Sequence, residues 1–230
     1  MDLNSDFTKR AVAHGERTAW TASPMAGVER RMLDRVGDDV ARATTIVRYA
    51  PHSVFSPHTH GGGEEFFVLE GVFQDEHGEY PPGTYVRNPP TSRHTPRSDR
   101  GCTILVKLWQ FDPGDRKQLV VRTNEKTYEP VAARAGVRLL PLYDDARENV
   151  RLERWSAGAD IVIGEPGGIE LFVLEGGFSD GVEVFGPQSW LRLPTGERAT
   201  VRVGKTGCRL WVKSGHLAHM PALPTDRQGN

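Results

Sequence analysis

The chain has 230 residues, and its 29 Lys and Arg nearly balance 30 Asp and Glu, giving a formal net charge of −1. This balance excludes a strongly basic surface, so we expect neither nucleic acid nor a membrane as a partner, and two cysteines are too few for a disulfide framework or a cysteine-rich zinc site. No apolar run approaches the ~20 residues of a membrane span, and the charged first residues lack the apolar core of a signal peptide, so we expect a cytoplasmic, globular protein.

Short apolar, β-branched segments separated by turn residues run through the whole chain, and this pattern is typical of an all-β protein. No segment has the period of an amphipathic helix. The first half predicts strands at Ala43–Tyr49, Glu65–Phe73, Gly83–Asn88 and Cys102–Trp109. The second half predicts strands at Arg151–Trp155, Glu170–Phe178, Ser189–Leu193, Ala199–Val203 and Cys208–Lys213.

An internal repeat relates the two halves. The segment Glu65–Phe73 reads EFFVLEGVF, and it returns as ELFVLEGGF at Glu170–Phe178, a shift of 105 residues. Two copies of one supersecondary unit explain such self-similarity most simply. We therefore expect two domains, 1–120 with an amino-terminal extension and 121–230, with a break near Asp112–Pro130 where turn residues interrupt the pattern.

The segment His58–Glu64, which reads HTHGGGE, carries the residues that point to chemistry. Side chains alternate along a strand, so His58 and His60 are expected on one face, and three glycines permit a reversal that returns Glu64 towards both rings. His94 follows a predicted strand and a turn that can bring it to the same place. Imidazole and carboxylate groups bind divalent metals. We therefore predict one divalent metal ion (Zn, Fe, Mn or Ni) held by His58, His60, Glu64 and His94.

Two alternatives to this set stay open. In the first alternative, His58 and His60 are ordinary surface residues beside a glycine-rich loop. A lone His-x-His would favour this interpretation, but the spacing to Glu64 and His94 argues against it. In the second, Glu65 replaces Glu64, although the parity of the following strand favours Glu64. At the shift of 105 residues, the positions equivalent to the four ligands are Ile163, Glu165, Ile169 and Ala199. Such a set is unsuited to a metal, so we expect the second half to be metal-free.

These spacings resemble the cupin superfamily, whose first motif has the form His-x-His-x3-Glu-x6-Gly and ends here at Gly71. The second motif is built on Pro and His, and it departs from the usual pattern at Thr91, where Gly is common. Further segments are similar to the ChrR-type cupin: Glu65–Phe73, Gly83–Tyr85, Pro89–Pro96 and Gly101–Lys107. The resemblance implies an all-β bicupin of two tandem cupin barrels (double-stranded β-helix, jelly-roll), with a metal-binding first barrel and a degenerate second barrel.

The same resemblance bears on partners. In the best-known ChrR-type protein the cupin is attached to a zinc-containing anti-sigma domain with a His-x3-Cys-x2-Cys motif. Cys102 and Cys208 lie 106 residues apart and form no such motif, so we expect no sigma factor as a partner. We expect a homodimer, because barrels of this type often pair edge to edge through an amino-terminal segment that covers a strand edge.

Two functions follow from the resemblance and the ligand set. The first is a mononuclear-metal dioxygenase or oxidoreductase acting on a small organic molecule, such as a diketone or hydroxyaryl ketone. The second is a non-catalytic sensor or regulatory module, related to stress responses or anti-sigma factors, with bound zinc. Cys102 is a possible redox partner in that function, but we favour the interpretation that it is a small buried hydrophobic residue following Gly101. No residue is assigned a catalytic role. The polar residues considered for substrate binding are Arg48, Tyr49, Tyr85 and Lys107.

Overall fold

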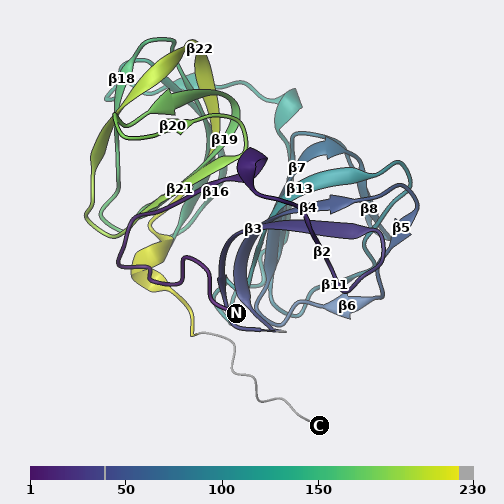
Figure 1. Cartoon of the computed structure of the whole chain (residues 1–230). Helices are drawn as coiled ribbons and strands as arrows, with labels where there is room; N and C mark the ends of the chain where they lie inside the picture. The colour runs from purple at the N-terminus through teal and green to yellow at the C-terminus, as the bar shows by residue number, and fades with distance from the viewer. Residues whose placement is uncertain (39, 223–230) are drawn as a thin grey trace. The chain divides into compact units, whose positions relative to one another are not determined.

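The computed structural model describes residues 1–38 and 40–222 and divides into two compact units. The first unit contains Met1–Ser5 and Ala19–Glu125, and the second contains Asp6–Thr18 and Lys126–Met220. Strands dominate both, and the described residues contain no α-helix, only 3-10 turns at Gly15–Arg17, Thr123–Glu125 and His216–His219 (Figure 1). The all-β class is therefore confirmed. None of these helical turns is long and apolar enough to cross a membrane.

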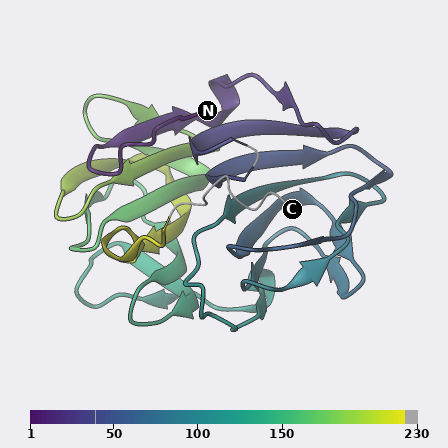
Figure 2. The ribbon, with the colours of Figure 1, turned by 90° about the horizontal axis from the view of Figure 1, so that it is seen from below.

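Antiparallel sheets make up the first unit. Its strands are β2 (Thr21–Ala22), β3 (Val28–Val36), β4 (Arg42–Tyr49), β5 (Ser53–Val54), β6 (His58–Thr59), β7 (Glu64–Gly71), β8 (Phe73–Asp75), β9 (Gly78–Tyr80), β10 (Thr84–Asn88), β11 (Arg93–His94), β12 (Arg97–Ser98), β13 (Cys102–Leu108) and β14 (Leu119–Arg122). The largest sheet has the order β14-β10-β7-β13-β4-β3-β2. A smaller sheet has the order β5-β12-β8-β9, and β6 pairs with β11. Figure 2 shows β3 and β4, in purple to blue, side by side.

One face of the large sheet carries the apolar core of the first unit. Phe66 on β7 lies opposite Val86 on β10 and opposite Val106 on β13, and all three are buried in one cluster. Because side chains alternate along a strand, Glu64 at the start of β7 shares this face and Glu65 takes the other. The register of the central strands thus carries the Glu64 carboxylate to the edge of the apolar core.

The second unit is also an antiparallel β structure. Its strands are β1 (Ala11–His14), β15 (Glu129–Pro130), β16 (Val137–Asp144), β17 (Asn149–Trp155), β18 (Asp160–Ile163), β19 (Ile169–Ser179), β20 (Val184–Phe185), β21 (Ser189–Leu193) and β22 (Ala199–Ser214). The main order is β1-β21-β19-β22-β17-β16-β15, with β18 beside β22 and β20 beside β19. The two segments expected separately at Ala199–Val203 and Cys208–Lys213 form one strand, because bulges in the β19 pairing absorb the residues between them.

The amino-terminal segment is placed differently from the expected division at residue 120. β1 pairs with β21, with Ala11 opposite Arg192. Arg10 Nη2 lies 2.6 Å from Asp180 Oδ2, and His14 Nε2 lies 2.8 Å from Glu183 Oε2. Asp6–Thr18 therefore belongs to the second compact unit, whereas the sequence pattern alone had grouped it with residues 1–120. Main-chain pairing of β1 with a strand edge determines where this segment lies. The pattern of its side chains does not reveal which strand it pairs with.

The internal repeat reappears as equivalent contacts in the two units. Gly71 and Gly176 are 105 positions apart and have φ angles of 67° and 68°. A Cβ at Gly71 would lie 2.1 Å from the carbonyl oxygen of Gly101, and one at Gly176 would lie 2.0 Å from that of Gly207. The repeated Leu-Glu-Gly therefore requires glycine at its last position for two reasons: the backbone has a positive φ there, and a neighbouring strand approaches it closely.

We expect Gly176→Ala to destabilise the protein more than Gly181→Ala. Gly181 also has a positive φ, 87°, but nothing lies within 4 Å of its added Cβ, so its substitution should cost only the left-handed penalty of about 1–2 kcal/mol. Gly176→Ala adds a collision with backbone. Urea unfolding followed by tryptophan fluorescence measures both free energies, and equal losses would contradict the steric argument.

Candidate metal centre

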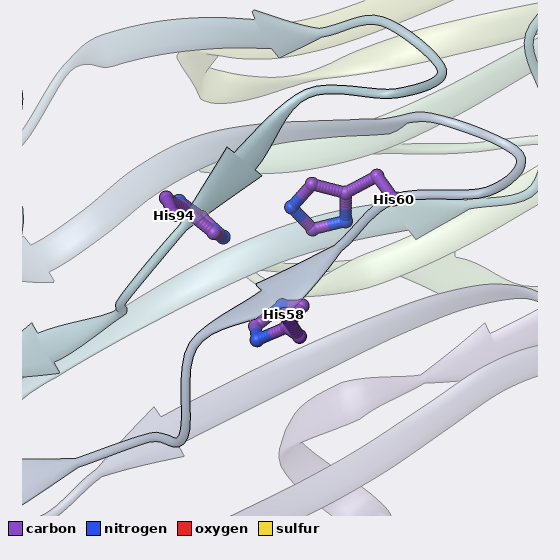
Figure 3. A group of neighbouring side chains, drawn as sticks. All are labelled: His58, His60 and His94. Carbon is purple, nitrogen blue, oxygen red and sulfur yellow. The ribbon is translucent and has the colours of Figure 1, made fainter.

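Three histidine rings converge in the first unit (Figure 3). β6 carries His58, the chain continues to His60, and β11 brings His94 opposite His58. The ring centroids of His58 and His60 are 4.9 Å apart, those of His58 and His94 5.1 Å, and those of His60 and His94 4.7 Å. One nitrogen of each ring lies within 4.8 Å of those of the other two. The three histidines could therefore hold one metal ion.

The carboxylate of Glu64 borders the three rings. Its Oε2 lies 3.4 Å from Nε2 of His60 and 3.5 Å from Nε2 of His94. The Asn88 amide donates a 3.2 Å hydrogen bond to the same oxygen and so fixes the orientation of the carboxylate. Glu65 points to the other face of β7, where it accepts a 2.7 Å hydrogen bond from the Tyr85 hydroxyl. Of the two carboxylates considered from the sequence, Glu64 is the one beside the histidines.

Hydrogen bonds on the far side of the rings orient them. Nδ1 of His94 lies 3.2 Å from Oδ2 of Asp75, and Nδ1 of His58 donates to the carbonyl oxygen of Ser56 at 3.0 Å. The other Asp75 oxygen accepts hydrogen bonds from the Tyr80 hydroxyl and the His77 N–H. Metal-binding histidines usually make such a bond with the nitrogen that does not face the metal. The sequence analysis gave Asp75 no role, because nothing local marks the partner of His94.

The residues present fit a divalent metal. Nε2 of His60 and Nε2 of His94 are buried and have no hydrogen-bond partner in the described part of the chain, whereas buried polar atoms normally have one. Both atoms face the side on which the Glu64 oxygen lies. Three imidazoles and one carboxylate are a donor set that Zn, Fe, Mn and Ni accept. His58, His60, His94 and Glu64 would hold the ion.

Protonation of the rings is set by burial and by the nearby carboxylates. Burial lowers the pKa of His60, and the proximity of His94 and His58 lowers it further, against the opposing effect of Glu64. Burial also acts to lower the pKa of His94, but the hydrogen bond that His94 donates to Asp75 and the charge of Glu64 outweigh it, so this pKa is raised. His60 is thus favoured as the neutral imidazole that a metal requires.

Packing against aromatic rings explains the three glycines of the loop. A Cβ at Gly62 would lie 2.4 Å from Cδ2 of Trp109, and one at Gly63, whose φ is 76°, would lie 2.4 Å from Cγ of Phe111. The N–H of Trp109 donates to the carbonyl oxygen of Gly63 at 3.1 Å. The loop therefore lies directly against the residues that follow β13, and this contact fixes the turn between His60 and Glu64.

A cavity of about 300 Å³ opens beside His58, His60 and Glu64. Its volume is at the lower end of the range for small-molecule sites, about 300–1,000 Å³. Two guanidinium groups, those of Arg30 and Arg35, also line it. Its apolar lining includes Val28, Val47, Tyr49, Phe55, Ile104, Val106, Leu108 and Trp109. A small organic molecule with an apolar part matches this lining.

Tyr49 is one of the four residues considered for substrate binding, and it lines the cavity. Arg48, the preceding residue of β4, takes the opposite face because side chains alternate. Its guanidinium is half exposed, lies 4.2 Å from the Trp20 ring and donates to Glu29 at 3.1 Å. The Arg48 side chain therefore lies away from this cavity.

Tyr85 and Lys107 also lie away from the cavity. Both occupy the face of the large sheet opposite Glu64, where the Tyr85 hydroxyl donates to Glu65 and the Lys107 ammonium donates to Oγ1 of Thr44 at 2.7 Å. The structure therefore does not bring either of these two predicted residues to the cavity. Both faces of these strands are buried, so the sequence pattern does not reveal which side chains point inwards.

The model of the ChrR Cupin-like domain matches the chain twice, at residues 8–112 and 116–218, and so spans most of it. No curated protein sequence matches significantly.

Solved structures share the fold at low sequence identity. A candidate dioxygenase from Nostoc punctiforme is 15% identical with a TM-score of 0.72, over 100% of this chain and 87% of that one. A candidate glyoxylate-induced protein from Pseudomonas aeruginosa is 18% identical with a TM-score of 0.72, over 93% and 91%. A bacterial pirin from Escherichia coli, in complex with nickel(II), is 12% identical with a TM-score of 0.64, over 90% and 98%. At these identities the likeness shows the tandem cupin fold alone. The two family matches show more: the chain belongs to the ChrR Cupin-like domain family and is a double cupin.

Proposed function

We propose that the chain is a mononuclear-metal dioxygenase or a related oxidoreductase, acting on a small organic molecule such as a diketone or hydroxyaryl ketone. The observation that carries the proposal is the convergence of three imidazoles and one carboxylate, of which His58, His60 and Glu64 line a largely apolar cavity. The candidate dioxygenase of similar fold supports it. The metal is proposed to be Fe, Mn or Ni, because the reaction requires an ion that changes redox state.

The metal, when bound, would supply Lewis acidity and open positions for a chelating ketone or enolate. Glu64 either binds that ion or accepts a proton from the acidic carbon of the substrate, and the Asn88 amide holds the carboxylate oxygen ready for both roles. The Asp75 carboxylate keeps His94 oriented. Val47 and Val106 line the cavity with apolar surface and so exclude water from the substrate.

One observation argues against the alternative function, a zinc-containing sensor. Cys102 is the candidate redox partner in that function, but burial raises its pKa to about 11. The thiol is therefore protonated at neutral pH, and a protonated thiol is a poor nucleophile. This observation favours the enzyme over an oxidant detector that uses Cys102.

We expect untagged protein from unsupplemented medium to contain about one Fe, Mn or Ni ion per chain, and His94→Ala to lose it. Elemental analysis measures both. His219→Ala is the matched control, because this histidine is exposed and lies in the second unit. About one zinc ion per chain would favour the sensor instead. Absence of metal from the wild type would contradict the metal centre.

We expect Asp75→Asn to weaken metal affinity about 10–100-fold, since the partner of a ligating histidine sets its orientation and basicity. Asparagine keeps an oxygen for the Tyr80 hydroxyl and the His77 N–H. Competition with a fluorescent chelator measures the affinity. Asp99→Asn is the control, since the carboxylate of Asp99 accepts from Gln74. Equal affinities of the Asp75 variant and the wild type would show that Asp75 does not support the site.

We expect aerobic incubation with acetylacetone or a hydroxyacetophenone to consume oxygen, and the His58→Ala variant to reduce this rate to background. An oxygen electrode follows the reaction, and product analysis identifies the bond that is cleaved. Uptake no faster than that of the variant would exclude these substrates.

A further inference from the structure

We propose that the ligand of this cavity is an organic acid, a small 2-oxo or 2-hydroxy carboxylate whose carboxylate group is bound by Arg30. The inference rests on the proposed function and names its substrate class. It changes the expected ligand from a neutral diketone to an anion.

Arg30 is placed to reach the cavity. It lies on β3 opposite Val47 of β4, and Val28, two residues earlier, also lines the cavity. Alternation along β3 therefore directs Val28 and Arg30 to the same side. β3 reads VERRMLDRV. Arg30 therefore places a charged side chain on the side of β3 that faces the cavity, where an apolar residue would extend the core.

Arg30 also has no partner within the described chain. Its Nε is buried without a hydrogen-bond acceptor, and no acidic side chain among residues 1–38 and 40–222 pairs with it. Two other arginines of this unit have acidic partners: Arg48 pairs with Glu29, and Arg87 pairs with Asp115. A buried guanidinium atom without an acceptor is costly. A bound anion would remove that cost, and a carboxylate matches the fork of the guanidinium with two parallel hydrogen bonds.

The charges around the cavity favour the same class of ligand. Two arginines, Arg30 and Arg35, and one acidic residue, Glu64, line the cavity. Arg35 already donates to the carbonyl oxygens of Gly37 and Asp38, whereas Arg30 has its donors available. A divalent ion at the histidines adds two positive charges, so the cavity as a whole attracts an anion. Its apolar walls, among them Val47 and Val106, accept the hydrocarbon part of such an acid.

The test uses the cobalt(II)-loaded protein, whose visible absorption reports ligands that enter the metal centre. The probes are 2-oxopentanoate and its neutral isostere 2,3-hexanedione. We expect wild-type protein to bind the acid more tightly than the dione. Arg30→Gln should weaken binding of the acid about 10–100-fold, as expected for loss of a charge-assisted pair, and leave the dione within about threefold. Arg30→Lys should bind the acid with intermediate affinity, because it keeps the charge and loses the fork.

Arg48→Gln is the matched control, because it removes a guanidinium from the opposite face of the adjacent strand. Thermal unfolding by circular dichroism establishes that each variant is folded. Equal affinity for the two probes in the wild type, or an equal loss of both in Arg30→Gln, would overturn the proposal. Failure of cobalt to bind would overturn the metal centre and this proposal with it. Tight binding of the acid without oxygen consumption would overturn the dioxygenase alone and leave the role of Arg30 supported.

Discussion

The packing of the glycine loop against Trp109 and Phe111 is the contact on which the metal centre depends. Gly62 and Gly63 lie so close to these rings that a single Cβ would collide with them. The resulting turn connects His60, which follows β6, to Glu64 at the start of β7, and it brings the carboxylate to within 3.4 Å of the His60 ring. Replacing either glycine would move the loop away from β13 and separate the two side chains. The site is thus a consequence of backbone contact as much as of ligand identity.

The second unit keeps an equivalent glycine loop with an equivalent backbone hydrogen bond, but it lacks the candidate metal-binding side chains. Gly167 and Gly168 stand at the positions equivalent to Gly62 and Gly63, and the N–H of Leu217 donates to Gly167 at 3.1 Å as that of Phe111 donates to Gly62 at 3.3 Å. The residue after this pair is Ile169 in place of Glu64, and it belongs to the apolar core. The scaffold of the loop is therefore kept while its side chains are used for packing.

Local spacing made the cluster of candidate ligands predictable from the sequence. His58, His60 and Glu64 lie within one short loop, so strand alternation and the glycines sufficed to place them together. Thr91 shows the same local logic, because the family motif commonly has Gly there and the structure gives Thr91 a φ of 77°. The strands built from apolar runs, such as β10 and β13, were also predicted within one residue at each end.

Features set by distant contacts were not predictable. β3 was not predicted, because its many charged residues mask the alternation of inward-facing and outward-facing side chains. Arg30 was therefore not considered as a residue of the cavity. The face on which Arg48 lies was not predictable, because its parity depends on which neighbours β4 pairs with. The position of β1 depends on an edge almost 180 residues away in the sequence. Asp75 reaches His94 through the pairing of β8 with β12.

X-ray absorption at the edge of the bound metal tests the central claim most directly, because it reports the ligands themselves. The four side chains predict three imidazole nitrogens and at least one oxygen at about 2.0–2.2 Å, with one imidazole lost in His94→Ala. A spectrum with sulfur ligands, or with fewer than three imidazoles in the wild type, would contradict a metal held by His58, His60, His94 and Glu64.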